Sequence, residues 1–253
     1  MSMSELFVKN PHSILVTLKR RPKDVVEVVF PRERPEGVWK EIESLVEHHR
    51  IRRGDGGGAP SARGQPRFKQ DRREAREGRE SGHGALIRAK AGISIERMFE
   101  NIDGDTRGLW LALDCLQDPQ NLGAIFRAAA FFGVKGIILT TERSVPMTAT
   151  VYDIACGGVE EVPFVQTINL KQALDRAKEA GLWILGTSEH AKTALFQVDR
   201  DRAWLMVLGN EEKGIRRLTE ESCDVLCSIP SAGTGVTSLN VSVAAGILIQ
   251  HLA

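Results

Sequence analysis

Residues 228–246 have the sequence Ser-Ile-Pro-Ser-Ala-Gly-Thr-Gly-Val-Thr-Ser-Leu-Asn-Val-Ser-Val-Ala-Ala-Gly. The apolar run at 225–229 breaks at a proline, and the two glycines that follow predict a loop. Thr237 and Ser238 are residue types that cap helices, so a helix is predicted over 239–252. Because this helix is apolar on nearly every face, it is predicted to be buried.

Three polar side chains interrupt this apolar helix, namely Ser238, Asn240 and Ser242. A buried polar group needs a hydrogen-bond partner, which here is backbone, substrate or cofactor. Loops of small polar residues between two buried elements are common places for functional sites. Helix capping and satisfied core positions explain the same residues equally well. The stretch therefore indicates a candidate site without identifying its ligand.

The charge of the chain is unevenly distributed. The 253 residues carry a net charge of +1, and their number suits one large domain or two small ones. Residues 50–90 hold 12 Lys and Arg against 5 Asp and Glu, whereas residues 91–253 hold 14 against 20. A basic segment joined to an acidic body is typical of a nucleic-acid-binding protein. A solvated linker accounts for the charge alone equally well.

The cysteines and the apolar runs indicate the cellular compartment in which the protein is expected to work. The four cysteines form no CxxC pair and lie mostly in apolar runs; they are Cys115, Cys156, Cys223 and Cys227. This pattern favours buried free thiols in a reducing compartment over a metal site, so no metal is expected. The sequence has no apolar run of about 18 residues and no leader pattern. We therefore expect a soluble, cytoplasmic protein without membrane contact.

Residues 1–98 predict a small α/β module, interrupted by a flexible basic segment at about 53–83. The predicted elements are a helix at 14–18, a strand at 25–30 and a helix at 38–48. The interrupting segment is rich in glycine and charge, and its composition cannot form a core. It is expected to be a disordered or exposed arm.

Residues 105–253 predict a second domain in which strands and helices alternate. Strands are predicted at 109–116, 134–140, 162–165, 182–185, 204–208 and 225–229, and helices at 122–132, 147–156, 170–180, 215–223 and 239–252. Two boundary signals are Gly133, expected to end the first helix, and Asn169, expected to cap the third. This alternation predicts a mostly parallel sheet with helices on both faces.

Three polar loops follow predicted strands, where open α/β sheets bind their ligands. The first two lie at 118–127 and 208–215, and the third is the stretch 228–246. No GxGxxG follows the first strand, so a Rossmann dinucleotide site is poorly supported. The sequence also has no GxxxxGK[ST] phosphate loop and no GxSxG nucleophile elbow.

Arg127 lies on a helix that is otherwise apolar. A charge in such a helix calls for an anionic partner. The candidates are Glu211 or Glu212 from the second loop, or an incoming phosphate, which a guanidinium binds well. An exposed arginine beside a buried face is the remaining explanation.

The three loops together resemble the signature motifs of the SpoU/TrmH branch of the SPOUT RNA methyltransferases. The matching motifs, in order, are Asn121-Leu-Gly-x-x-x-Arg127, Leu208-Gly-x-Glu211-x-x-Gly214, and Ile229-Pro-x-x-Gly233 followed by Ser238-Leu-Asn-Val-Ser-Val-Ala. The match covers about residues 107–252. Residues 6–35 also resemble the N-terminal RNA-binding module of the RlmB-like subgroup, which methylates a guanosine ribose in 23S rRNA.

The resemblance implies a deep trefoil knot in the C-terminal domain and S-adenosylmethionine as cofactor, bound in a bent shape largely by backbone groups. It places the cofactor against four residues, namely Thr187, Gly209, Ile229 and Leu239. It also implies a homodimer, with the last helix and the first-motif helix in the interface.

The reaction implied is methyl transfer to a ribose 2′-hydroxyl. The family assigns the base role to the arginine that matches Arg127, but an arginine normally stays protonated, so a phosphate anchor is an equal alternative. Asn121 and Glu211 would position Arg127, while Ser238 and Asn240 would position ribose or cofactor.

The chain departs from the family pattern in the third loop, where 230–238 is one residue longer, and in the basic segment. Deleting 54–80 is expected to weaken RNA binding and flatten its salt dependence. Ribosomal RNA is the favoured substrate, because the tRNA enzymes of the family generally lack such an N-terminal module. A tRNA methyltransferase and a non-catalytic RNA-binding or ribosome-assembly homologue are the alternatives.

Overall fold

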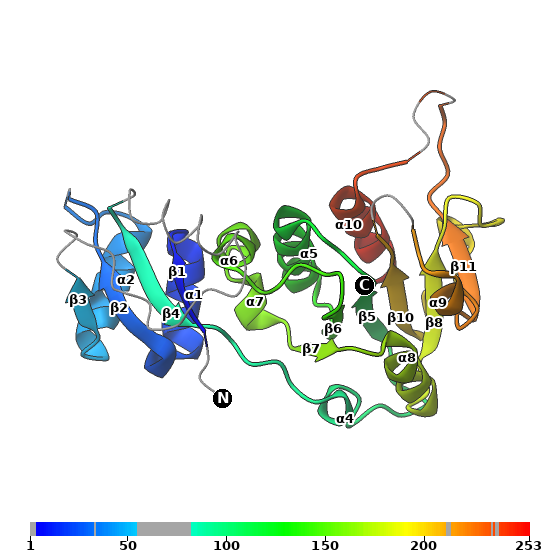
Figure 1. Ribbon diagram of the computed structural model, residues 1–253, viewed down its shortest axis with the longest axis horizontal. Helices are drawn as coiled ribbons and strands as arrows, with labels where there is room; N and C mark the ends of the chain where they lie inside the picture. Colours follow the sequence, from blue (N-terminus) through cyan, green and yellow to red (C-terminus); the bar gives the residue numbers. More distant parts are fainter. Residues whose placement is uncertain (1–3, 33, 55–81, 211–213, 234, 236–237) are drawn as a thin grey trace. The chain divides into compact units, whose positions relative to one another are not determined.

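The computed structural model describes residues 4–32, 34–54, 82–210, 214–233, 235 and 238–253 (Figure 1). Most of the segment predicted to be flexible, as well as Glu211 and Thr237, lies outside these residues. The chain packs as two units, one formed by Met1–Ala91 with Met147–Glu161 and the other by Gly92–Pro146 with Val162–Ala253. The sequence gives no sign that residues 147–161 group with the N-terminal part.

The first unit is built on a four-stranded sheet in the order β1-β4-β2-β3. Only the β2–β3 pair is parallel. The strands are β1 (Glu5–Val8), β2 (Val25–Val29), β3 (Arg52–Gly54) and β4 (Gly84–Arg88), and the helices are α1 (Pro11–Arg20), α2 (Val38–His48), α6 (Ala149–Ala155) and α7 (Gly158–Glu161). The prediction of α2 is confirmed at both ends, whereas β1 and β3 are too short to show a period in the sequence.

Polar contacts hold α1 to the segment that carries α6 and α7. The Asp153 carboxylate accepts the backbone N–H groups of Lys9 and Asn10 at 2.8 and 2.7 Å. The Glu160 carboxylate, 1% exposed, pairs with the Arg21 guanidinium at 2.8 Å. A buried ion pair of this kind is strongly destabilising to break, because one charge is then left without a partner.

The second unit contains a seven-stranded sheet in the order β7-β6-β5-β10-β8-β11-β9, and every neighbouring pair is parallel. Its strands are β5 (Gly108–Leu113), β6 (Gly136–Thr140), β7 (Phe164–Thr167), β8 (Trp183–Thr187), β9 (Thr193–Ala194), β10 (Ala203–Leu208) and β11 (Val225–Ser228). The predicted parallel α/β fold is therefore confirmed.

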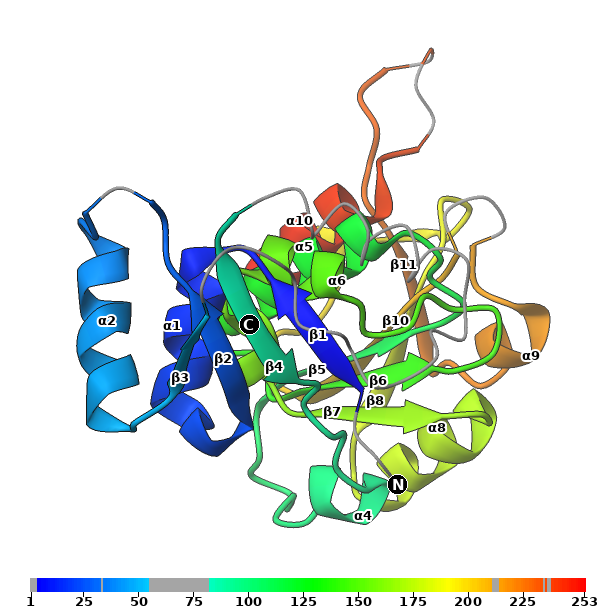
Figure 2. The same cartoon turned by 60° about the vertical axis from the view of Figure 1, so that its left-hand side comes forward.

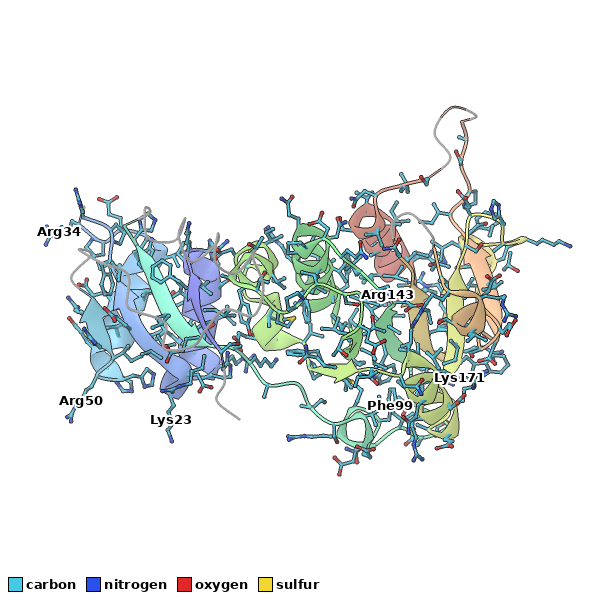
Figure 3. All side chains as sticks on the ribbon, in the orientation of Figure 1. Lys23, Arg34, Arg50, Phe99, Arg143 and Lys171 are labelled. Carbon is cyan, nitrogen blue, oxygen red and sulfur yellow. The ribbon has the colours of Figure 1, made fainter. Side chains whose placement is uncertain are left out.

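Helices cover both faces of this sheet. On one face, α8 (Leu170–Glu179) packs with α4 (Ile95–Met98) and Phe99 over a core that includes Trp110 and Ala112 of β5 (Figure 3). Side chains alternate along a strand, so Leu111 points to the opposite face. There α10 (Val241–Leu252) packs against both β5 and α5 (Pro119–Phe132).

The strand order places a topological switch between β5 and β10. From β5 the chain moves outward through β6 and β7, then crosses to β8 and returns as β10 beside β5. Open α/β sheets bind ligands at such a switch, outside the carboxyl ends of the strands. The trefoil knot stays a prediction for the path of residues 208–252.

The first-motif helix α5 forms for reasons that are visible in its sequence. The Asp118 side chain accepts a hydrogen bond from the Gln120 N–H at 2.8 Å, and Pro119 occupies the first turn. Gly133 ends the helix in the left-handed region at φ 75°, as predicted. Asn169 caps α8 as predicted, by accepting from the Gln172 N–H.

Two helix predictions near the motifs are wrong. The helix predicted at 215–223 is a single short turn, α9 (Arg217–Glu220), because Arg216 is extended at ψ 144°. The last helix begins at Val241 and is capped by Asn240 rather than by Thr237 or Ser238. The prediction that this segment is buried is also wrong for three of its residues: Leu239, just before the helix, and Val243 and Ile247 within it are exposed.

Candidate active site at the carboxyl edge of the parallel sheet

The predicted site residues gather at the carboxyl ends of neighbouring strands. Thr187 ends β8, Gly209 follows β10 and Ile229 follows β11. These strands are adjacent in the sheet, and β5, which leads into the first motif, lies next to β10 (Figure 1). Since all four strands are parallel, their following loops meet at one edge of the sheet.

A hydrogen bond joins the first and third motifs at this edge. The Asn240 amide donates from Nδ2 to Oδ1 of Asn121 at 3.0 Å, across 119 positions of sequence. Asn121 lies in the first turn of α5 and is 6% exposed. The Asn240 Oδ1 accepts from the N–H and hydroxyl of Ser242, which fixes Asn240 as the cap of α10. Two predicted site residues are thus brought together directly.

Arg127 lies apart from this pair on the surface of α5. Six residues correspond to roughly 240° around a helix, so Arg127 and Asn121 lie on different faces. Arg127 is exposed. Within the described part of the chain, its guanidinium has neither an ion pair nor a hydrogen bond. It is therefore a cation that is available to an incoming anion.

The second-motif loop is closed by a tight backbone contact. Asn210 and Gly214 exchange two backbone hydrogen bonds at 3.0 and 2.9 Å, and Gly214 has φ 65°. A Cβ added to Gly209 would lie 2.1 Å from the carbonyl carbon of Gly214. Only glycine fits at position 209, because the returning chain crosses directly over it. Glu211 belongs to the part of this loop that lies outside the described residues.

An ion pair between a buried acid and a half-exposed arginine lies beside this loop, and none of the three motifs includes either residue. Asp114 is fully buried, and its carboxylate pairs with the Arg216 guanidinium at 2.7 and 3.0 Å. It also accepts the Thr219 hydroxyl at 3.1 Å. The pKa of Arg216 is raised, chiefly by its hydrogen bonds to Asp114. Burial raises the pKa of the neighbouring Cys115 thiol. The only sequence signal for this group is an acid at the end of an apolar strand.

The third-motif loop differs from the other two because it extends away from the sheet. Its described residues between β11 and α10 form an arm in both views (Figures 1 and 2). Ser238 and Leu239 are exposed, whereas Ile229 at the base of the loop is partly buried. No hydrogen bond links Ser238 to Arg127 or Asn121 among the residues that the structure describes.

The strand ends suit a cofactor that is held by backbone groups. Loops leave β8, β10 and β11 side by side, and the close approach at Gly209 leaves no room for a side chain. The Thr187 hydroxyl donates to the Val207 carbonyl at 3.0 Å, so it ties the ends of β8 and β10 together. Over the described ranges, no cluster of three or more His, Cys, Asp or Glu side chains could hold a metal ion. None of the described helices is long and apolar enough to cross a membrane.

Comparisons with known proteins agree with this geometry. Residues 108–250 match the model of the SpoU rRNA methylase family. A protein of Pseudomonas aeruginosa named 23S rRNA (guanosine-2′-O-)-methyltransferase RlmB is 35% identical over 95% of this chain and 93% of its own length. A Nitrosomonas europaea protein of the same name is 48% identical over 56% of this chain and 54% of its own length.

Solved structures show the same fold at low identity. The SpoU methyltransferase AviRb from Streptomyces viridochromogenes superposes with a TM-score of 0.76 at 19% identity, over 98% of this chain and 88% of that one. An AdoMet-bound rRNA methyltransferase from Sinorhizobium meliloti superposes with a TM-score of 0.69 at 17% identity, over 98% and 87%. At these identities the structures establish the shared fold alone.

Proposed function

Because this chain belongs to the SpoU rRNA methylase family, we propose that it transfers the methyl group of S-adenosylmethionine to a ribose 2′-hydroxyl in ribosomal RNA. The Pseudomonas relative matches nearly the whole chain, so a guanosine of 23S rRNA is the proposed target. The observation that carries the proposal is the Asn121–Asn240 hydrogen bond, which joins the first and third motifs after the end of β5, the strand next to β10.

The cofactor is proposed to bind at the ends of β8, β10 and β11. Thr187, Gly209, Ile229 and Leu239 would hold it. The chemistry that it supplies when bound is an electrophilic methyl group on a sulfonium. Gly209 fits this placement, because the second-motif chain crosses directly over it and so brings its backbone to the end of β10.

Arg127 is proposed to act on the nucleophile. A ribose hydroxyl is a poor nucleophile while it is protonated, so the site must orient it and favour loss of its proton. A guanidinium that stays protonated does this by binding the adjacent phosphate and stabilising negative charge on the 2′-oxygen. The absence of an ion-pair partner for Arg127 among the described residues favours this phosphate-anchor role over a base role.

The remaining predicted residues are proposed to orient these groups. Asn240 is already fixed by Asn121 and the first turn of α10, so it can present its amide to the ribose or cofactor. Ser238 is proposed to join it when the third-motif loop closes on its ligand. Glu211 is proposed to orient Arg127.

A homodimer is proposed from the exposed apolar side chains of α5 and of α10 with its flanking residue. We call this group the α5/α10 apolar patch; its members are Phe131, Phe132, Leu239, Val243 and Ile247. Phe131 is 82% exposed, and patches of this kind mark protein–protein interfaces. The buried Nε2 atom of His251 on α10 also has no hydrogen-bond partner in the described chain. A second copy packed on α5 and α10 would cover these apolar groups.

The function is tested with purified protein, tritiated S-adenosylmethionine, and 23S rRNA or tRNA transcripts. We expect label in a 2′-O-methylguanosine of 23S rRNA. Arg127→Ala should lose this transfer while calorimetry still detects cofactor binding. Retained turnover in that variant would refute the role of Arg127. Label in tRNA alone would support the tRNA alternative, and RNA binding without any transfer would support a non-catalytic homologue.

A further inference from the structure

We propose that the Asp114–Arg216 ion pair is a positioning device that fixes the second-motif loop over the end of β5 for cofactor binding. The inference rests on the proposed function, because it assigns Gly209 and its loop to the cofactor. Neither residue belongs to the predicted catalytic set. Both act through the backbone that they hold, so they are positioning residues.

Both oxygens of the buried carboxylate bind donors that follow the second-motif loop, and Oδ1 also accepts from the Cys115 thiol at 3.5 Å. The Asp114 Oδ1 pairs with Nη2 of Arg216 at 2.7 Å, and Oδ2 accepts from Nε at 3.0 Å and from the Thr219 hydroxyl at 3.1 Å. This is the two-pronged geometry in which a guanidinium fits a carboxylate. It fixes the direction of the arginine as well as its distance from the acid.

The pair spans the topological switch. Asp114 directly follows β5, and its N–H donates to the Leu208 carbonyl at the end of β10 at 2.8 Å. Arg216 comes two residues after Gly214, which closes the second-motif loop against Asn210. The two residues therefore connect the start of the first-motif segment to the far end of the second-motif loop.

A second contact fastens the near end of the same loop. The Asn210 amide donates from Nδ2 to the Cys115 carbonyl at 3.1 Å. Cys115 has φ 61°, a conformation that is costly for a residue with a side chain. Its N–H is held by the Thr140 hydroxyl at 2.9 Å. The turn after β5 thus keeps an unfavourable backbone conformation in which its carbonyl reaches Asn210.

The Asp114 carboxylate is fully buried, whereas the Arg216 side chain is 49% exposed, so the pair serves position rather than stability. Taking a carboxylate out of water costs about as much as its ion pair returns, so such pairs are poor sources of stability. Their best-attested role is to specify one arrangement over others. The arrangement specified here is the return of the chain across Gly209, where a Cβ would not fit.

The first unit provides a comparison pair, and all four predicted cofactor residues belong to the other unit. The Glu160 side chain is 1% exposed and that of Arg21 is 18% exposed, and the two pair in a similar two-pronged geometry at 2.8 Å from both Nε and Nη2. Glu160→Gln should therefore reproduce the loss of stability of Asp114→Asn without its functional effect. Arg217, adjacent to Arg216 in sequence, pairs with Glu221 on the surface and provides a second control.

The test measures S-adenosylmethionine binding by calorimetry, kcat and KM for 23S rRNA, and thermal stability in four variants. We expect Asp114→Asn to raise the cofactor dissociation constant at least tenfold and to lower kcat, with KM for RNA changed less than twofold. Arg216→Lys keeps the positive charge but loses the two-pronged contact of the guanidinium with Asp114, so it should show a smaller change in the same direction. Glu160→Gln and Arg217→Gln should keep wild-type cofactor binding.

The outcomes separate this inference from the proposed function. Wild-type protein that does not bind S-adenosylmethionine would overturn both. Wild-type binding with an unchanged dissociation constant in Asp114→Asn and Arg216→Lys would overturn the positioning role alone, whatever their melting temperatures. If Asp114→Asn does not fold, the Arg216→Lys variant provides the test. Cofactor binding as tight as in the wild type, in folded Arg216→Lys protein, would contradict the inference.

Discussion

The first-motif and third-motif segments reach the same edge of the sheet, but they differ in how far they are buried. The first, residues 114–127, is largely buried, and its helix is capped at both ends. The third, residues 229–240, is mostly exposed where it is described, and Asn240 ties it to the first motif. The fold itself therefore fixes the first half of the site. The described residues of the third-motif loop have fewer contacts with the rest of the unit, apart from the hydrogen bond of Asn240.

The largest effect is expected from a change at Gly209, where the second-motif loop packs tightly on the end of β10. Gly209→Ala would place a Cβ 2.1 Å from the Gly214 backbone, so the second-motif loop must move. We expect methyl transfer to fall to background and the melting temperature to drop. A Cβ at Gly233, in the third-motif loop, meets no described atom within 4 Å. Gly233→Ala should therefore leave the melting temperature unchanged; equal melting temperatures for the two variants would contradict the comparison.

The next effect concerns the Asn121–Asn240 hydrogen bond, which joins the two segments. Removing either amide, by Asn121→Ala or Asn240→Ala, should slow methyl transfer roughly tenfold, which corresponds to about 1.4 kcal/mol. Since both changes break the same hydrogen bond, the double variant should lose less than the two single losses combined. Single-turnover rates measure this coupling. Fully additive losses would mean that the two asparagines act independently.

A smaller effect is expected on assembly. Aspartate in place of Val243 and Ile247 would put two charges in the α5/α10 apolar patch, so we expect light scattering to report a monomer where the wild type is a dimer. Aspartate at Ile168 and Leu218, which are exposed apolar residues elsewhere in the same unit, provides the control. A wild-type monomer, or a dimer that survives the patch variant, would exclude this interface.

The smallest effect concerns the base of the third-motif segment, and it is confined to alkaline pH. Burial raises the pKa of the Cys227 thiol in β11 from 9.0 to about 11. A raised folded-state pKa means that the thiol's contribution to stability is fully present below pH 9 and is lost as pH rises towards 11. Urea unfolding between these values should show a decline of at most about 1.4 kcal/mol per pH unit from this group. Cys227→Ala should reduce the decline of stability with pH. An equal decline in the wild type and the variant would mean that the Cys227 thiol is open to solvent.

Local signals in the sequence were sufficient for much of the fold. Apolar periodicity predicts α2 at both ends, and Gly133 and Asn169 mark helix boundaries that the structure confirms. Capping near α10 was misplaced, because Thr237, Ser238 and Asn240 are all good caps and only tertiary contact with Asn121 selects one. The three exposed apolar residues of this region could not be recognised, because composition does not show which face lacks a neighbour.

The candidate site was predictable only where a motif marks it. Asn121 and Asn240 belong to motifs, and the structure places them in contact. Asp114 is paired with a residue 102 positions away, and no local spacing indicates such a contact. Sequence motifs therefore identify Asn121 and Asn240 more readily than a buried acid whose partner lies far along the chain.

The central claim is that this edge of the sheet methylates a ribose of ribosomal RNA. The most direct test is to map 2′-O-methyl groups on 23S rRNA from cells that lack the gene, and from the same cells supplied with wild-type or Arg127→Ala protein. We predict that one 2′-O-methylguanosine disappears, returns with the wild type and stays absent with Arg127→Ala. An unchanged methylation map in cells without the gene, or full restoration by Arg127→Ala, would contradict the account.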